Sequence, residues 1–382
     1  MIEICDNSKN LYRRIQLAKE ELKHTKNPDE KIALCNYIEN VYDAISLTDD
    51  RNLCIGKKDV FGSFKYYKKF IKKMNIYEDE VTDNFLLNKS YIKGYVGKLV
   101  LDIENENLDG IDNNVDVFEV LSLDDYNDIF FQFMQSINLD SFFEKFLKDG
   151  NIYNYKIKEG NALGSTLFNP INGNTDILIG DFVPDIQSLF TLAHEMGHVY
   201  DLNYFNKDSK SFNRFFYQSF YGEVCPRLFE RLFLNYMINN NILKEDAKEK
   251  MLDSLYDNYN YLMSCYILSV LDDSFIKELN CSVIDVDSFY NLIKRYFKPL
   301  IKDFILEIKY MDLQEDYTYA FGDIVSMFLL DSINKYGFSN DLVNEFINER
   351  DKMFRKDFLE DNGLSSNNYM ELYKKELKLL KK

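Results

Sequence analysis

Residues that break helices are scarce in this chain, and this scarcity limits the folds open to it. Only five prolines and fifteen glycines occur among 382 residues. Glycine and proline supply the turns that a fold of many short strands requires, so an all-β sandwich or barrel is disfavoured. Long stretches without either residue instead carry apolar residues at helical spacing. We therefore predict a mainly α-helical fold.

Helices are predicted along most of the chain. The dipeptide Asn27-Pro28, a typical stop and start signal, separates the first two of them. From Glu223 onward the helical pattern continues almost to the C-terminal lysines. In the first half, the predicted helices cover about residues 9–26, 28–47, 58–76, 83–101 and 123–149.

One segment has a different character. Residues 150–182 are rich in glycine, asparagine and β-branched residues, which predicts short strands and turns, with one strand at 176–181. Pro184 and Asp185 then open another apolar-periodic helix. We divide the chain at this change into an N-terminal helical part, residues 1–149, and a second part, residues 150–382, which together form one continuous unit.

The composition argues against several classes of partner. The formal net charge is −17, whereas a nucleic-acid-binding surface needs positive charge to displace counterions from phosphate. The chain has no apolar run long enough to span a membrane and no apolar N-terminal segment of the secretory type. Its six cysteines form no CxxC pair. We expect a cytoplasmic protein with reduced thiols that binds neither nucleic acid nor membrane.

Two of the three histidines lie four residues apart in 191-TLAHEMGHVYD-201. Positions i and i+4 of a helix share a face, so His194 and His198 can direct ring nitrogens to one metal ion. Glu195 projects beside the metal, where it can take a proton from the attacking water. The alternative is a chance HExxH, and the apolar flanks and the rarity of histidine argue against it. The remaining His24 lies in a lysine-rich stretch and receives no role.

A catalytic zinc site also needs a third protein ligand. A metzincin would place a histidine six residues after His198, but this position is Tyr204, so we expect a carboxylate. Asp201, on the same helix, is better interpreted as surface charge or as a partner of a ligand histidine. Glu223 can reach the metal from the next helix, and Glu230 lies about two turns later on the same face. An ordinary amphipathic helix accounts for this pair equally well.

The spacing of these residues resembles that of the thimet oligopeptidase and oligoendopeptidase F family of zinc peptidases. In that family an HExGH helix is followed, 25 residues after its second histidine, by a ligand glutamate that opens a helix, and another glutamate comes seven residues later. The same intervals separate His198 from Glu223 and Glu223 from Glu230. The similarity extends to the upstream strand ILIGDF, to 189-LFTLAHEMGH-198 and to 223-EVCPRLFERLFLNY-236.

This resemblance implies a role for each residue. His194, His198 and Glu223 would bind one zinc ion per chain. Glu195 would act as general base and then as general acid, and Glu230 would support a ligand histidine from behind. The resemblance also implies a helical zincin-type peptidase fold, in which residues 150–382 are the catalytic part. Such a fold has a small β-sheet insert before the HExxH helix and a substrate cleft between two helical halves.

The family also carries a tyrosine-rich stretch that lines the substrate site, and 317-YTYAFGD-323 is similar to it. By this resemblance Tyr319 donates a hydrogen bond to the oxyanion, a role that suits a phenol because it is neutral at pH 7. Tyr317 and Tyr310 are predicted as further site tyrosines. With 28 tyrosines in the chain, such a pair is often only a packing feature.

Two departures from the family pattern concern the substrate. Family members usually carry a histidine shortly before the tyrosine pair, whereas residues 305–314 contain none. The chain is also shorter than typical members, and the missing length falls before residue 150. A reduced N-terminal part would leave the cleft more open and relax the family's restriction to short peptides.

These features predict a zinc-dependent metalloendopeptidase that hydrolyses short, unstructured peptides. The strand at 176–181, with Ile179 and Gly180, would pair with an extended substrate backbone and so permit weak sequence specificity. Two alternatives stay open: a zinc-containing protein that binds peptides without cleaving them, and a metalloprotease that acts on one specific folded protein. The presence of Glu195 argues against the binding protein, which needs no general base.

Overall fold

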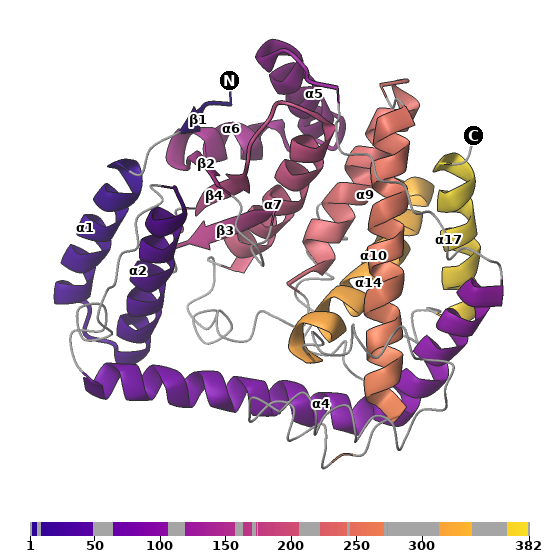
Figure 1. Cartoon of the computed structure of the whole chain (residues 1–382). Helices are drawn as coiled ribbons and strands as arrows, with labels where there is room; N and C mark the ends of the chain where they lie inside the picture. Colours follow the sequence, from indigo (N-terminus) through magenta and orange to yellow (C-terminus); the bar gives the residue numbers. More distant parts are fainter. Residues whose placement is uncertain are drawn as a thin grey trace.

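Long helices surround one small sheet in the computed structural model (Figure 1). The prediction of a mainly helical fold, with a small sheet before the helix that carries the two histidines, is confirmed. Among the helices described, none is both long enough and apolar enough to cross a membrane. The structure describes residues 2–5, 9–48, 64–105, 119–156, 163–169, 173, 175–205, 222–242, 245–270, 273, 313–337 and 365–380.

The elements follow one another as a short strand, helices, a strand cluster and helices again. The strands are β1 (Ile4–Cys5), β2 (Ile152–Tyr155), β3 (Gly164–Phe168) and β4 (Thr175–Gly180). The helices are α1 (Lys9–His24), α2 (Pro28–Thr48), α4 (Phe64–Asn105), α5 (Leu123–Ser136), α6 (Asp140–Asp149), α7 (Ile186–Phe205), α9 (Val224–Asn239), α10 (Glu245–Val270), α14 (Leu313–Tyr336) and α17 (Ser366–Leu380).

Two helix boundaries predicted from the sequence were wrong. The segments 58–76 and 83–101, predicted as two helices, belong to the single helix α4 over their described residues, because no glycine or proline interrupts the chain between Phe64 and Gly94. Conversely, 123–149 forms the two helices α5 and α6. Asn138 between them has a φ of 57°, a left-handed conformation that a helix cannot continue through.

The sheet has the strand order β1-β2-β4-β3. β1 and β4 both pair in parallel with β2, whereas β3 pairs antiparallel with β4. β4 therefore lies inside the sheet, and β3 forms an edge of it among the described strands. The two-residue β1 was not predicted, because so short a strand shows no alternation of apolar and polar residues.

Successive side chains of β4 enter two different cores, as the alternation of a strand requires. Ile177 and Ile179 pack in the larger core, to which α5, α6 and α7 contribute. Leu178 packs on the other face, in a smaller core formed with α1 and α2. The sheet is thus covered on both faces, and its position relative to α7 is set by buried apolar contacts.

A buried ion pair further ties α1 to the sheet. The guanidinium of Arg14 donates to both carboxylate oxygens of Asp176, at 3.0 and 3.1 Å. The same carboxylate accepts hydrogen bonds from the backbone and the side-chain amide of Asn151, at 3.0 and 2.9 Å. Asp176, in the first half of β4, thereby fixes the strand that leads into α7.

The remaining helices lie on the other side of α7. α7 packs on the sheet through β3 and β4 and also packs on α9. α9 in turn packs on α14, and α14 packs on α10. α4 extends along the base of the view in Figure 1, from α2 to α10 and α17, and contacts all three. Elements from both sides of residue 150 therefore share the sheet and the helical packing, and the division at that residue stays a prediction.

The start of α7 agrees with the expectation for Asp185. Its Oδ1 accepts a hydrogen bond from the backbone N–H of Ser188 at 2.8 Å, in the first turn of the helix. This bond satisfies one of the N–H groups that have no partner within the helix. The helix that carries the histidines thus begins at a defined residue, close after the end of β4.

Candidate metal centre

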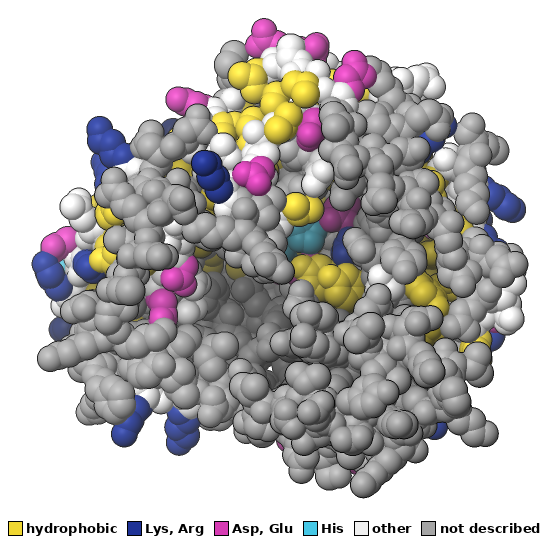
Figure 2. All heavy atoms as spheres, viewed as in Figure 1, with side chains coloured by type: hydrophobic (Ala, Val, Ile, Leu, Met, Phe, Trp, Pro, Cys, Tyr) yellow, Lys and Arg dark blue, Asp and Glu magenta, His cyan; other side chains and the backbone are white. Residues whose placement is uncertain are grey.

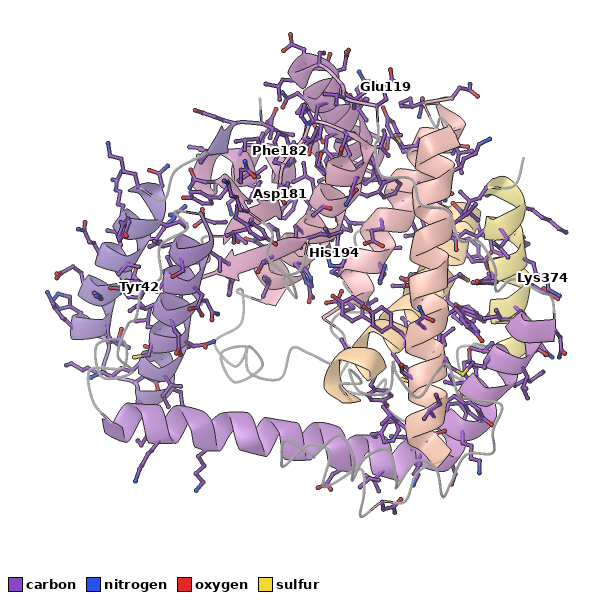
Figure 3. The ribbon with its side chains drawn as sticks, viewed as in Figure 1. Tyr42, Glu119, Asp181, Phe182, His194 and Lys374 are labelled. Atoms are coloured by element: carbon purple, nitrogen blue, oxygen red, sulfur yellow. The ribbon has the colours of Figure 1, made fainter. Side chains whose placement is uncertain are left out.

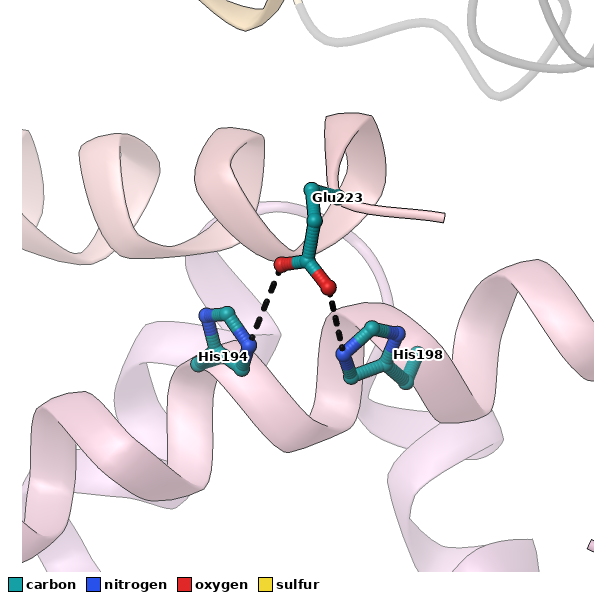
Figure 4. A group of neighbouring side chains, drawn as sticks. All are labelled: His194, His198 and Glu223. Carbon is teal, nitrogen blue, oxygen red and sulfur yellow. Dashed lines mark ion pairs between the residues drawn. The ribbon is translucent and has the colours of Figure 1, made fainter. Parts of the chain in front are cut away.

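The carboxylate of Glu223 meets both histidines of α7 where α9 crosses that helix (Figure 4). Its Oε2 lies 3.4 Å from Nε2 of His194, and its Oε1 lies 3.6 Å from Nε2 of His198. A tetrahedral zinc ion with ligand bonds of about 2.0–2.1 Å separates its ligand atoms by about 3.4 Å. One atom from each of the three residues lies within 4.8 Å of the others. The group therefore fits the donor set of a single zinc ion.

The surroundings of Glu223 also favour a cation at this place. Oε2 of Glu223 is buried and makes no hydrogen bond among the described residues. Glu223 is the N-cap residue of α9, but its side chain does not cap the helix. Burial disfavours the charged form of a carboxyl group, and it raises the pKa of Glu223. A metal ion between Glu223 and the histidines would remove that penalty.

The histidines are reachable from outside. The side chain of His194 is 15% exposed, and that of His198 is 23% exposed. Figure 3 shows His194 pointing from α7 toward the middle of the molecule. In Figure 2, histidine atoms appear at the surface near the centre of the face shown, beside acidic and apolar side chains. Solvent can therefore reach the donor group.

Two glycines allow α9 to come this close. A Cβ on Gly197 of α7 would lie 2.5 Å from Cα of Pro226 and 2.7 Å from the carbonyl carbon of Cys225. A Cβ on Gly322 of α14 would lie 2.7 Å from Cβ of Glu223. Such distances are too short for real atoms, so a side chain at either position would push the start of α9 and its carboxylate away.

Glu230 holds the ring of His194 from behind. Its Oε1 lies 2.8 Å from Nδ1 of His194, so that Nδ1 can donate a proton to it and leave Nε2 for a metal. Before a metal binds, burial by itself lowers the pKa of His194, but the hydrogen bond with Glu230 and the charge of Glu223 raise it to about 9. For His198, burial lowers the pKa to about 4. His194 is thus the ring that carries a proton at neutral pH.

Glu195, the expected general base, is buried and held by the edge strand β3. The hydroxyl of Thr166 donates a hydrogen bond to Oε2 of Glu195 at 2.6 Å. A Cβ on Gly164 would lie 2.4 Å from Oε1 of the same carboxylate. The sequence analysis missed Thr166 and Gly164, because no spacing along the chain connects a strand residue to a helix about 30 residues later.

The predicted tyrosines lie in different environments. Tyr319 stacks on Tyr261 of α10, with ring centroids 4.7 Å apart and planes at 13°. Tyr317 is 1% exposed and makes edge-on ring contacts with Phe85 and Phe321. Tyr317 is therefore a core residue, and its burial contradicts the role in contacting substrate that the resemblance implied. Tyr310 lies outside the described residues.

The structure also corrects the role of the strand at 176–181. Ile179 pairs with Asn154 of β2 on one side and with Gly164 of β3 on the other, and Gly180 pairs with Tyr155 of β2. An interior strand has no free edge, so β4 cannot pair with a substrate backbone. Ile179 is moreover buried in the larger core.

Asp201 and His24 complete the account of the predicted residues. Asp201 is 1% exposed, so its interpretation as surface charge was wrong. Its position in the sequence alone did not show this burial. His24 is exposed at the end of α1, far along the chain from the other two histidines.

Comparison with known proteins supports the same family. The chain is similar to an oligoendopeptidase F homolog of Borreliella burgdorferi, with 24% identity over 153 residues. The match covers 37% of this chain and 25% of the relative, so the chain spans about a quarter of that protein. No family model and no solved structure matches. With the group His194, His198 and Glu223, this match confirms a distant, partial resemblance to oligoendopeptidase F.

Replacing Gly197 should weaken metal binding. In Gly197→Ala, the added methyl group collides with backbone atoms of α9 and moves Glu223 away from the histidines. We expect the zinc affinity to fall by about 10–100-fold, the range found when the support of a metal ligand is lost. Competition with a chromophoric chelator measures this change.

A matched control is Gly94→Ala in α4, where an added Cβ would meet no atom within 4 Å. This variant should keep its zinc affinity and gain up to about 1 kcal/mol of stability, because alanine is a better helix former than glycine. Equal zinc affinity in both variants would contradict the role assigned to the helix crossing.

Zinc affinity should also depend on pH in a defined way. Zinc binds the neutral imidazole, so zinc uptake must displace the proton of His194 at any pH below the raised pKa of about 9. The affinity should therefore rise about tenfold per pH unit between about pH 6 and 8. The fall at low pH is steeper if Glu223 is protonated too, because burial raises its pKa. Chelator competition at several pH values tests this, and a flat profile would contradict it.

Proposed function

We propose that this protein is a zinc-dependent metalloendopeptidase that hydrolyses short, unstructured peptides. One observation carries the proposal: His194, His198 and Glu223 form a three-donor metal site, and the buried Glu195 directly follows His194 on the same helix. His194 and His198 flank it on α7, and Glu223 faces both histidines from α9. The partial similarity to an oligoendopeptidase F homolog supports the same assignment.

The donor set suits a hydrolytic zinc rather than a purely structural one. Structural zinc sites usually have four protein ligands, whereas catalytic sites have three and leave one position open. Among the described residues the candidate donors here number three, His194, His198 and Glu223, and both histidines are partly exposed. When bound, zinc supplies Lewis acidity, which activates water and polarises a carbonyl group.

Glu195 would move the proton. It takes a proton from the attacking water and delivers it to the nitrogen of the leaving amine, so it acts first as base and then as acid. The hydrogen bond from Thr166 at 2.6 Å fixes Oε2 of Glu195. Gly164 leaves space at Oε1, and this oxygen is the one that we assign to proton transfer.

The substrate backbone would lie along β3. Among the described strands, β3 has a partner only in β4, so its outer edge is available for pairing with an extended peptide. The same strand holds Glu195 through Thr166. A peptide paired with this edge would therefore pass close to the general base. Backbone pairing reads no side chains, which suits a peptidase of weak sequence specificity in a cleft between the helical halves.

Tyr319 is our candidate for stabilising the oxyanion. A phenol hydroxyl donates one hydrogen bond without carrying charge, and this bond strengthens as negative charge develops on the carbonyl oxygen. The ring of Tyr319 is partly exposed and fixed by stacking on Tyr261. Tyr317, two residues earlier, is enclosed in the core and has no part in the proposal.

A peptide library with a quenched fluorophore, read by mass spectrometry, tests the activity. We expect cleavage of short peptides that a chelator abolishes and added zinc restores. Peptides that are retained without being cleaved would instead indicate a zinc-containing binding protein. Cleavage of one folded protein, with short peptides ignored, would indicate the third function that the sequence left open.

Replacement of Glu195 separates metal binding from catalysis. Glu195→Gln should bind zinc as the wild type does but lose about 10²–10⁴-fold in kcat, the range typical of a general base. Glu223→Ala is the matched control, because it should lose both zinc and activity. Zinc content by atomic absorption and peptide turnover give the two readouts. Undiminished turnover by Glu195→Gln would overturn the mechanism.

A further inference from the structure

A buried arginine links the metal donors to the tyrosine proposed for the oxyanion. Arg227 lies in the first turn of α9, four residues after Glu223, and is 7% exposed. Its Nη1 donates to Oε2 of Glu230 at 3.0 Å, and the other oxygen of Glu230 lies 2.8 Å from Nδ1 of His194. Glu230 thus connects the guanidinium of Arg227 to the candidate metal donor His194.

The same guanidinium contacts the ring of Tyr319. Its central carbon lies 5.2 Å from the ring centroid, a distance at which a cation is attracted to an aromatic face. The ring of Tyr319 also stacks on Tyr261 of α10. Tyr319 therefore has contacts to α9 and to α10, and both restrict where its hydroxyl can point.

We infer that Arg227 is a positioning residue that sets His194, through Glu230, and Tyr319 in one fixed arrangement. The role of Tyr319 rests on the proposed function, whereas the support of His194 does not. Arginine suits both contacts because its planar guanidinium can accept a ring against its face while its edge donates to a carboxylate. Lysine has a compact charge that can keep the ion pair but cannot present a flat surface to the ring.

Two substitutions separate the contacts. Arg227→Met removes both, and we expect the zinc affinity to fall by about 10–100-fold, as for other residues that support metal ligands. Arg227→Lys keeps a charge beside Glu230 and should retain most of the zinc affinity. Both variants should show a lower kcat at saturating zinc, because Tyr319 loses its contact with the guanidinium.

Arg231→Met is the matched control. Arg231 lies one turn later on α9 and is 2% exposed. It pairs with Asp323 at 2.6 Å and with Glu376 at 3.4 Å, and among the described residues it makes no ion pair with the metal donors. Its loss should lower the melting temperature through the buried charge of Asp323 that it leaves behind. The zinc affinity of the folded variant should stay at the wild-type value.

A double-mutant cycle with Tyr319→Phe tests the second contact. Tyr319→Phe should lower kcat by about 100-fold. Arg227→Lys should lower kcat by about tenfold in the wild-type background and leave it nearly unchanged in the Tyr319→Phe background, since the two residues act through one contact. Arg231→Met should have the same effect on kcat in both backgrounds. A crystal structure of Arg227→Lys should show the Tyr319 ring in a changed position.

Three results would overturn the inference: wild-type zinc affinity in Arg227→Met, independent effects of Arg227→Lys and Tyr319→Phe, or an unmoved Tyr319 ring in the crystal. Failure of the proposed function looks different. If the wild type cleaves no peptide, kcat cannot be measured. The zinc affinities and the crystal structure still decide whether Arg227 positions His194 and Tyr319.

Discussion

The close crossing of α7 and α9 at Gly197 is the contact on which the donor group depends. Because Gly197 has no side chain, the backbone at Pro226 can lie against the turn between the two histidines. That approach brings the carboxylate of Glu223 to 3.4 and 3.6 Å from their ring nitrogens. The position of α9 also sets that of Glu230. This residue lies two helical turns after Glu223 and contacts Nδ1 of His194, the ring nitrogen that does not face Glu223. The close approach at Gly197 thus helps to arrange residues from two helices that also pack through Phe190 and Phe233 and through Tyr200 and Phe229.

The centre concentrates buried and half-buried carboxylates in a protein that is already acidic. Each of the three has a different compensation. Glu195 accepts a hydrogen bond from Thr166, Glu230 pairs with Arg227 and with His194, and Glu223 faces the two histidines. A buried charge without compensation costs several kcal/mol. A divalent cation at Glu223 would complete this balance, so metal binding and the stability of this region are coupled.

The errors of the sequence interpretation have two distinct causes. β4 carries the strongest strand pattern, but periodicity does not reveal strand order, and β3 occupies the edge next to Glu195. The second cause is that helix geometry was not applied to Tyr317 and Tyr319, whose different environments could have been predicted from the sequence. Residues two apart on a helix point about 200° apart, so both could not face one site. Tyr317 accordingly enters the core, and Tyr319 faces Arg227.

By itself the sequence determined the helical class, the strand insert and the three candidate metal donors, because each depends on spacing along one chain. The intervals from His194 to His198 and on to Glu223 can be counted without a structure. Only the tertiary structure decided which strand lies beside Glu195 and which residues hold its carboxylate. Thr166, Gly164 and Arg227 act through contacts between separate elements, and such contacts follow from packing and strand order rather than from local periodicity.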